Sequence, residues 1–409
     1  MRARRGGAAA RLSAAAVRLQ GTTLGYVIAA AIATGEGGLG VVLTPYLKDN
    51  GLSVPAIGAF VALYALAGLA SRLPGGRWYR PGWVRRLLVI GLLLQCVAVA
   101  AFPLFHDGWA LAALRLVSGF GYGLGSTVNL AQFLDSLSGD RGRERATAYF
   151  TAANSSGFAL GNVTAGFLAN QFGFAAAFVG VACYPLLAIV VTLLAVEPPV
   201  RRAAARSVSL GLQLRALGEP LLLIVLIEGF LLQFLFGMQY ALFPLYLLAA
   251  GVTLAELGVM RGAFSGTQVV SRLGAGWLSA RFGHRRVAAG GLAAQILALA
   301  VVPLTTNVIL LGTLQVAFGG ARGVMMMANT LGLAKASDRT TLSRGACSAS
   351  YNAASDLGTL LGPLLTGGVA GVVGVGEAFV AVPLGVLAIY ATSVWLNARR
   401  PAPVPRPAD

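Results

Sequence analysis

The chain has 409 residues, of which 57% are hydrophobic and only 11% are charged, yet its formal net charge is +17. Soluble domains carry about 25% charged residues, so this composition excludes an ordinary soluble enzyme and a disordered chain. It also fits poorly with a soluble nucleic-acid-binding protein, which is basic but not apolar. We therefore expect a membrane protein with no nucleic-acid partner.

The first residues, 1–21, are rich in arginine and then in alanine. Such a stretch is either a targeting peptide or a short cytosolic tail. A secretory signal peptide needs an apolar core of about 7–15 residues, and none precedes the first long apolar stretch. We therefore favour a cytosolic N-terminal tail.

Twelve long apolar stretches follow, six on each side of a polar segment at 197–219. A helix crosses the bilayer core with about 20 apolar residues, and lipid offers no partner to an unpaired backbone. We predict an all-α polytopic membrane protein with twelve transmembrane helices in two six-helix halves, 22–196 and 220–398, and a C-terminal tail at 399–409. The predicted spans lie near 22–47, 54–74, 84–106, 109–134, 146–170, 173–196, 220–248, 255–279, 287–305, 309–334, 345–371 and 375–398.

Lysine and arginine are unevenly distributed around these spans. With the N-terminus in the cytosol, 27 of the 31 basic residues fall in the two tails, the middle loop 197–219 and the other cytosolic loops, whereas the outer loops hold only Lys48. Because cytosolic loops carry the excess of basic residues, both termini are predicted to be cytosolic. Arginine outnumbers lysine 29 to 2, which suggests a GC-rich bacterial source and a location in the cytoplasmic, or cell inner, membrane.

The second half of the chain repeats the first. At an offset of 200 residues, 22 of the 84 positions from 46 to 129 are identical to their partners. The identities include residues that are not common apolar types, such as Tyr46 with Tyr246 and Gln95 with Gln295. This predicts two pseudo-symmetric six-helix bundles related by an axis along the membrane normal, an arrangement common in secondary transporters.

A basic motif follows the second span of each half. The second copy reads Gly276-Trp-Leu-Ser-Ala280-Arg281-Phe-Gly283-His-Arg285-Arg286, and a looser copy begins at Gly76. Together with the repeat, it resembles the major facilitator superfamily, whose motif is Gly-x-x-x-Asp-Arg-x-Gly-Arg-Arg. The resemblance covers essentially the whole chain. It implies an alternating-access carrier with a central cavity lined by spans 1, 4, 7 and 10.

The aspartate of that family motif is replaced here by Ala280. Asp135, at the cytosolic end of span 4, is the candidate substitute, through contact with Arg72 or Arg145. The residues that we assign to a cytosolic gate are Arg72, Gly76, Asp135, Arg145, Arg272, Gly276, Arg281 and Gly283.

Spans 5 and 11 carry glycine-rich runs. Gly157, Gly161 and Gly166 lie in span 5, and Gly358, Gly362 and Pro363 lie in span 11. These runs resemble part of the Gly-x-x-x-Gly-Pro-x-x-Gly-Gly sequence of drug–proton antiporters, with Asn162 in place of proline in span 5. The same spacing also suits close helix packing, and we favour that interpretation. The antiporter branch is nevertheless the part of the family that the chain resembles most.

We assign six charged residues to the membrane interior: Glu36, Arg115, Glu228, Arg261, Arg322 and Asp356. A charge at mid-bilayer costs about 2.5–3.5 kcal/mol on insertion scales, so each is a candidate functional group. At a rise of about 1.5 Å per residue, Glu36 and Arg115 both lie about 21 Å from the cytosolic face, whereas Glu228 and Arg322 lie about 10–12 Å from it. We therefore predict one polar level in each half.

Polar residues share helix faces with these charges, because residues three, four or seven apart lie on one side of a helix. Span 4 places Tyr122, Ser126 and Asn129 on the face of Arg115, and methionine in span 10 suits a wall that adapts to varied shapes. The residues that we assign to the substrate cavity are Glu228, Gln239, Arg322, Tyr122, Ser126, Asn129, Met326 and Asn329.

Glu36 is the predicted proton carrier. Burial favours a neutral carboxyl and a neighbouring arginine favours the charged form, so a carboxyl subject to both can change protonation when the cavity switches sides. Arg115 would supply the positive charge, and its spacing from Gly119 resembles the Arg-x-x-x-Gly of proton-coupled members of the family. The alternative is a permanent ion pair that only fixes helix packing. Asp356 is the competing proton site.

The predicted function is proton-coupled efflux of a small, amphiphilic organic compound by a monomeric secondary transporter. The alternatives are proton-coupled uptake of a nutrient or organic anion, with Arg115 and Arg322 as ligands, and, remotely, a membrane sensor or enzyme on a transporter scaffold. The sequence has no Cys/His cluster of the kind that binds zinc and no phosphate-binding loop. We expect no enzyme activity, no metal and no cofactor. The expected partners are a small-molecule substrate, protons and the lipid bilayer.

Overall fold

A computed structural model of the chain describes residues 21–80, 82–137, 143–195, 218–340 and 342–399, without the side chains of residues 72–78, 143, 144 and 398. The predicted tails, at 1–20 and 400–409, and most of the predicted middle loop, at 196–217, lie outside the described residues. The same holds for the side chain of Arg72 and for the surroundings of Gly76.

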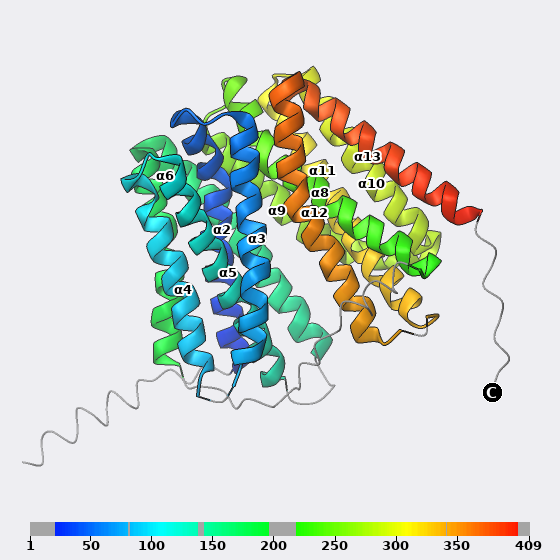
Figure 1. The fold of residues 1–409 in the computed structure, drawn as a ribbon, viewed down its shortest axis with the longest axis horizontal. Helices are drawn as coiled ribbons and strands as arrows, with labels where there is room; N and C mark the ends of the chain where they lie inside the picture. Colours follow the sequence, from blue (N-terminus) through cyan, green and yellow to red (C-terminus); the bar gives the residue numbers. More distant parts are fainter. Residues whose placement is uncertain (1–20, 81, 138–142, 196–217, 341, 400–409) are drawn as a thin grey trace, which may run out of the picture.

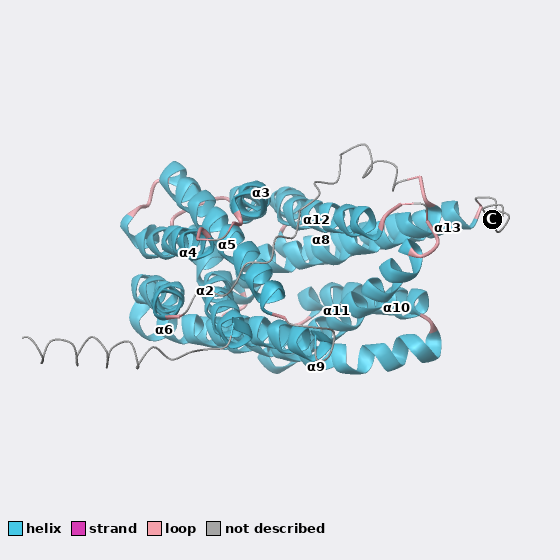
Figure 2. Cartoon of the chain, turned by 90° about the horizontal axis from the view of Figure 1, so that it is seen from below, coloured by secondary structure: helices cyan, strands magenta, loops and turns pink. Residues whose placement is uncertain are grey.

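The described residues form eleven α-helices (Figure 2). Long apolar sequences favour this outcome, because a helix satisfies its own backbone hydrogen bonds within lipid. The helices are α2 (Gly21–Asp49), α3 (Val54–Trp78), α4 (Val84–Ala101), α5 (Gly108–Ser136), α6 (Arg143–Leu194), α8 (Pro220–Ala249), α9 (Leu254–Phe282), α10 (His284–Val301), α11 (Val308–Ser337), α12 (Arg344–Val373) and α13 (Val375–Ala398).

Helix α6 consists of two helical stretches that meet at Gly173. This residue has φ 82° and ψ 174°, outside the helical region, and glycine reaches a positive φ without the steric cost of a side chain. The two stretches coincide with the predicted spans at 146–170 and 173–196.

Nine of the described helices are long and apolar enough to cross a membrane, but α5 and α9 are not among them. This differs from the prediction of twelve apolar spans. Both helices combine a buried arginine, Arg115 in α5 and Arg261 in α9, with several glycine, serine and other polar residues. These residues lower the mean hydropathy of both helices.

The repeat in the sequence is also present in the structure. Figure 1 shows α2–α6 on one side of the molecule and α8–α13 on the other. Helices α4 and α10 have bounds exactly 200 residues apart, and each ends in a short 3-10 helix, at Phe102–Leu104 in the first half and Val302–Leu304 in the second.

Glycines allow the closest helix crossings within each half. A Cβ added to Gly161 of α6 would overlap the carbonyl oxygen of Thr34 in α2, and one added to Gly362 of α12 would lie 2.5 Å from the carbonyl oxygen of Phe234 in α8. Real Cβ atoms do not approach a backbone this closely. These glycine runs therefore pack helices, which is the interpretation that the spacing favoured.

Two further glycine crossings join the halves to each other at one end of the molecule. Gly58 in α3 packs against the backbone of α12 near Gly367, and Figure 1 shows these two helices side by side. Gly166 in α6 packs against Gly258 in α9, where an added Cβ would lie 2.8 Å from the Gly258 Cα atom. Both contacts lie near the turns that precede α3 and α9, so the halves are closed against each other at that end.

Candidate substrate and proton site

A cavity of about 240 Å³ lies between the two halves. Of the predicted site residues, Glu36, Arg115, Tyr122, Ser126 and Asp356 line it. The other polar and aromatic side chains of its wall, which the sequence prediction did not include, are Tyr64, Phe158, Gln233, Phe236, Tyr240 and Thr359. Both halves therefore contribute to one polar, aromatic cavity.

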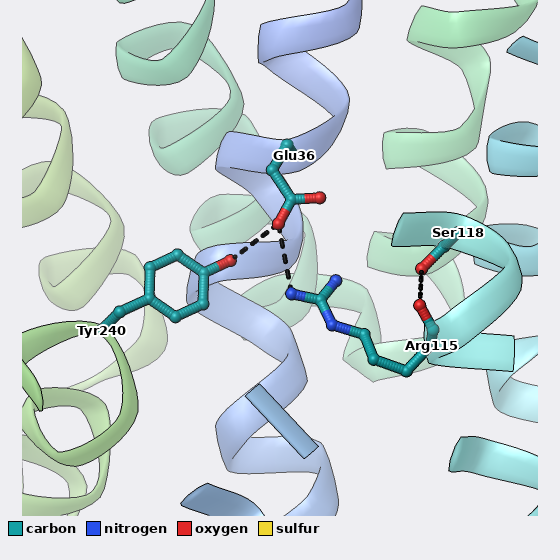
Figure 3. Close-up of polar contacts among 4 residues, drawn as sticks. All are labelled: Glu36, Arg115, Ser118 and Tyr240. Atoms are coloured by element: carbon teal, nitrogen blue, oxygen red, sulfur yellow. Dashed lines mark hydrogen bonds and ion pairs between the residues drawn. The ribbon is translucent and has the colours of Figure 1, made fainter. Parts of the chain in front are cut away.

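Glu36 and Arg115 form an ion pair in the wall of this cavity (Figure 3). Glu36 Oε1 lies 3.2 Å from Arg115 Nη2, and the two side chains are 4% and 0% exposed. Helix α2 supplies the acid and α5 supplies the base, so the pair joins two helices of the first half. The pair also places one negative and one positive charge in the protein interior, where the free-energy cost of removing charges from water is high.

A tyrosine from the other half completes the contact. Tyr240 of α8 donates a hydrogen bond of 3.3 Å from its hydroxyl to Glu36 Oε1 (Figure 3). On the opposite side, the Arg115 guanidinium lies 4.5 Å from the ring centre of Tyr64, an arrangement that stabilises a buried cation. Glu36 therefore touches both halves of the molecule at once.

Arg261 is a second buried cation beside this cluster. Its side chain is 3% exposed, and its guanidinium lies 4.6 Å from the ring centre of Tyr240. Its backbone carbonyl accepts a hydrogen bond from Asn162 at the crossing of α6 and α9. Arg261 thus connects the closed end of the molecule to the tyrosine that contacts Glu36.

A second hollow, of about 520 Å³, adjoins the cavity at Ser126. Asn129, Phe150, Asn154 and Asn352 are among its lining residues. It lies toward the ends of the helices opposite the two glycine crossings between the halves. Asn129, a predicted cavity residue, also donates a hydrogen bond of 3.1 Å to the carbonyl oxygen of Gly25.

The predicted cavity residues of the second half lie elsewhere. Arg322 of α11 donates to the Leu232 carbonyl oxygen at 2.7 Å and to Gln233 Oε1, and it stacks on Phe236 at 4.2 Å. The family resemblance implied that span 10 lines the cavity, but α11 supplies no lining residue because Phe236 and Gln233 stand between Arg322 and the cavity. Gln233 in turn donates to Thr359 at 3.3 Å.

Four other predicted residues of the second half are also away from the cavity. Gln239 donates a hydrogen bond of 2.8 Å to Gln315, and both are buried. Met326 accepts a hydrogen bond from Arg272 at 3.3 Å, and Asn329 is fully buried in α11. Glu228 lines a separate pocket with Arg285 and accepts a hydrogen bond of 3.0 Å from Tyr390. The structure therefore does not bring Glu228 and Arg322 together.

The predicted gate residues are spread over several contacts. Asp135 accepts a hydrogen bond of 2.8 Å from Tyr79, a residue that the sequence prediction missed. Burial and this hydrogen bond raise the pKa of Tyr79, so it remains a donor at neutral pH. Arg145 donates to Tyr149 at 3.0 Å.

The second copy of the motif ends one helix and starts the next. Gly283 has φ 84° and separates α9 from α10. Arg281 lies 5.5 Å from the ring centre of Trp277. A Cβ on Gly276 would meet no neighbouring atom within 4 Å. Gly283 is therefore required by its backbone conformation, whereas Gly276 is not required by packing.

Three of the lining residues that the prediction missed share one face of α8. Gln233, Phe236 and Tyr240 lie three, four and seven residues apart in α8, and such residues fall on one side of a helix. The sequence contained this signal, but the prediction followed the charged Glu228 instead. Among the described residues, no group of three or more His, Cys, Asp or Glu side chains is placed to hold a metal ion.

These features define a multi-span, all-α membrane protein with a polar cavity between two related helix bundles. The model of the Major Facilitator Superfamily matches residues 25–249 and 225–409. The chain belongs to this superfamily. It is therefore a secondary transporter of small molecules, and not an enzyme.

Two curated relatives are similar to parts of the chain. Multidrug resistance protein 1 of Bacillus subtilis is 30% identical over 170 residues, which cover 40% of this chain and 42% of the relative. The quinolone resistance protein NorA of Staphylococcus aureus is 29% identical over 129 residues, 32% of this chain and 33% of the relative. The matched part thus spans less than half of each relative.

Solved structures support the fold over nearly the whole chain. A bacterial homologue of the human lysosomal transporter Spinster, in an inward-facing and unoccupied conformation, has a TM-score of 0.77 at 16% identity and covers 93% of this chain and 96% of that one. The nucleoside transporter NupG has a TM-score of 0.76 at 11% identity and covers 94% and 100%. At these identities the likeness concerns the fold alone.

Proposed function

We propose that the chain is a proton-coupled exporter of small organic compounds. The observation that carries this proposal is the buried Glu36–Arg115 ion pair, 3.2 Å long, in the wall of a cavity between the two halves. An ion pair that served only helix packing would have no need to face such a cavity. A proton carrier must face it, because its proton has to be gained on one side of the membrane and lost on the other.

The surroundings of Glu36 suit a reversible change of charge. Burial favours its neutral form, whereas Arg115 favours the carboxylate. The hydrogen bond from Tyr240 comes from the other half, so it exists only while α2 and α8 are close at this level. When the two halves move against each other, this contact changes and with it the balance between the two forms. Proton release and conformational change are thereby linked.

The architecture that we infer has twelve membrane spans, in halves 22–196 and 220–398, with both termini and the middle loop 197–219 in the cytosol. The positions of the basic residues support this orientation. In that orientation the two glycine crossings between the halves lie at the outer end, and the 520 Å³ hollow lies toward the cytosol. The structure then corresponds to a conformation open toward the cytosol.

The substrate that we infer is a drug-like or metabolite-like organic compound. Tyr64, Tyr122, Phe158, Phe236 and Tyr240 give the cavity an aromatic wall, and Asp356 adds a carboxyl. Aromatic side chains bury large apolar areas while tyrosine hydroxyls bind polar groups. The direction of transport is inferred from the two relatives, whose names describe resistance to drugs.

We also infer a cytosolic gate around Asp135. Tyr79, after the end of α3, and Asp135, near the end of α5, are joined by a hydrogen bond. In the proposed cycle this contact, Arg72 and Arg145 regulate closure on the cytosolic side. Replacement of Asp135 by asparagine should then slow transport without preventing folding.

The test uses the purified protein in proteoliposomes with a panel of compounds and a pH gradient of either sense. The proposal predicts that at least one compound is transported in the direction opposite to the proton flux. It also predicts that Glu36→Gln abolishes this coupling. Asp338→Asn, which changes an exposed carboxylate, is the matched control and should transport normally. Intact coupling in Glu36→Gln would refute the role of Glu36, and movement of substrate together with protons would show uptake instead of efflux.

A further inference from the structure

The surface of the second half that faces the lipid carries an apolar groove between α9, α10 and α11. Its volume is about 500 Å³, and its lining includes Phe282, Arg286, Gly290, Ala294 and Val324. Gly290 and Ala294 are exposed on α10. The groove is separate from the cavity between the halves, with which it shares no lining residue.

The groove exists because two side chains are small. At an offset of 200 residues, Gly290 and Ala294 correspond to Ile90 and Leu94 of the first half. A Cβ added to Gly290 would meet no atom within 4 Å, so the space beside it is open. The larger residues of the first half occupy the equivalent positions on α4, where Ile90 is 48% exposed.

The floor of the groove is a close helix crossing in both halves. A Cβ on Gly291 would lie 3.0 Å from Met325 Cβ, and one on Gly91 would lie 2.8 Å from the Gly125 nitrogen. Close packing at the floor is therefore common to the two halves, although Ala321 and Met325 replace Gly121 and Gly125 there. The outward-facing side chains, in contrast, are smaller in the second half.

Positive charge and aromatic rings mark one end of the groove. Arg286 is the charged residue of its lining, and Arg281 lies 5.5 Å from the ring centres of both Trp277 and Phe282. Trp277 is 62% exposed, and tryptophan concentrates at the level of lipid headgroups. This end therefore lies where a headgroup phosphate would be found, on the side predicted to face the cytosol.

We propose that the groove binds one acyl chain of an anionic phospholipid, whose phosphate is held by Arg286 and Arg281. Lipid tails are as apolar as the groove wall, so the hydrophobic effect does not drive binding of an acyl chain. The favourable free energy comes from close van der Waals packing. The charge adds specificity, because basic residues near the membrane surface attract anionic lipids. Among the residues that line the groove there is no acidic side chain to oppose this attraction.

The test is native mass spectrometry of the full-length protein in detergent, titrated with phosphatidylglycerol, phosphatidylcholine or inorganic phosphate. We expect a saturable phosphatidylglycerol site, with weaker binding of phosphatidylcholine and no competition from inorganic phosphate. Arg286→Gln should weaken phosphatidylglycerol binding about fivefold. Arg86→Gln, at the equivalent position of the first half, is the control and should bind as the wild type does.

A second variant removes the groove and not the charge. Gly290→Ile with Ala294→Leu gives the second half the residues of the first, and it should abolish the site. Both substitutions point into open space, so elution as a single species by gel filtration is expected to be unchanged. Equal phosphatidylglycerol binding by this variant would overturn the proposal. Equal binding of phosphatidylcholine, or displacement by inorganic phosphate, would also overturn it, the latter by indicating an anion site.

Discussion

The two halves of the molecule share a framework but differ in charge. Tyr46 donates a hydrogen bond of 3.0 Å to the carbonyl oxygen of Phe105, and Tyr246 donates one of 3.3 Å to that of Thr305, 200 residues further along. Both bonds attach the end of a long helix to the corner after the 3-10 helix. Such positions are identical in the two halves because they hold the backbone in place.

The polar pairs in the middle of the halves show the difference. Arg115 pairs with Glu36 in the first half, whereas Gln315, the equivalent of Arg115, pairs with Gln239 in the second. The second half therefore has a neutral amide where the first half has Arg115, and the partner of that amide, Gln239, lies three residues after Phe236, the equivalent of Glu36. Since buried ion pairs are no more stabilising than neutral groups that fit the site, the charge of the first half is better explained by function than by folding.

The framework itself should give the largest effect. Gly161→Leu would force a side chain against the carbonyl oxygen of Thr34. Backbone atoms cannot move aside as a flexible side chain can, so we expect a loss of about 5 kcal/mol or more and no folded protein. The measurement is the yield of monodisperse protein after extraction. Gly385→Leu is the control, since nothing lies within 4 Å of its added Cβ; similar yields from the two variants would refute the packing role.

Breaking the ion pair should have the next largest effect. Arg115→Gln leaves Glu36 buried without its cation, which we expect to cost about 3 kcal/mol. Adding Glu36→Gln replaces the unpaired buried carboxyl by a neutral amide and should recover most of that loss. Thermal unfolding in detergent measures both variants. A double variant as unstable as Arg115→Gln would show that two neutral amides cannot replace the ion pair at this position.

The contact between the halves should contribute less. Tyr240→Phe removes the hydroxyl that donates to Glu36 and keeps the ring that packs on Arg261. A hydrogen bond to a charged group is worth about 1.5–3 kcal/mol, so the unfolding temperature should fall modestly and the pH dependence of transport should shift. Tyr184→Phe, which removes a hydroxyl that donates to Thr164 within α6, is the control and should leave the pH profile unchanged. An unchanged pH profile in Tyr240→Phe would contradict the proposed link between the halves.

The smallest effect is expected for an ion pair in water. Arg344 lies 2.8 Å from Asp338, but their side chains are 82% and 56% exposed. Exposed pairs contribute little because water and salt screen them. Asp338→Asn should therefore change the free energy of unfolding by less than about 0.5 kcal/mol. A larger change would mean that exposed ion pairs also stabilise this fold. The exposed pair and the buried Glu36–Arg115 pair would then not differ in the way that we expect.

The sequence predicted the helices and the repeat well, because apolar length and an offset of 200 residues are properties of the chain itself. It also indicated that Glu36 and Arg115 lie at one depth, since depth follows from helix rise. The rotation of each helix and the contacts between halves depend on packing, which periodicity does not contain. The spacing in α8 indicates the face that carries Tyr240, but it does not indicate the contact of Tyr240 with Glu36 in the other half. Glu228 was placed at the cavity although it accepts a hydrogen bond from Tyr390 inside the second half.

The most direct measurement compares two kinds of transport in the same proteoliposomes. The variant with both Glu36→Gln and Arg115→Gln carries an amide pair in each half. If the charge serves proton coupling and not folding, this variant will still exchange an accepted compound in counterflow but will no longer accumulate it in response to a pH gradient. Accumulation at the wild-type level in the double variant would contradict the account.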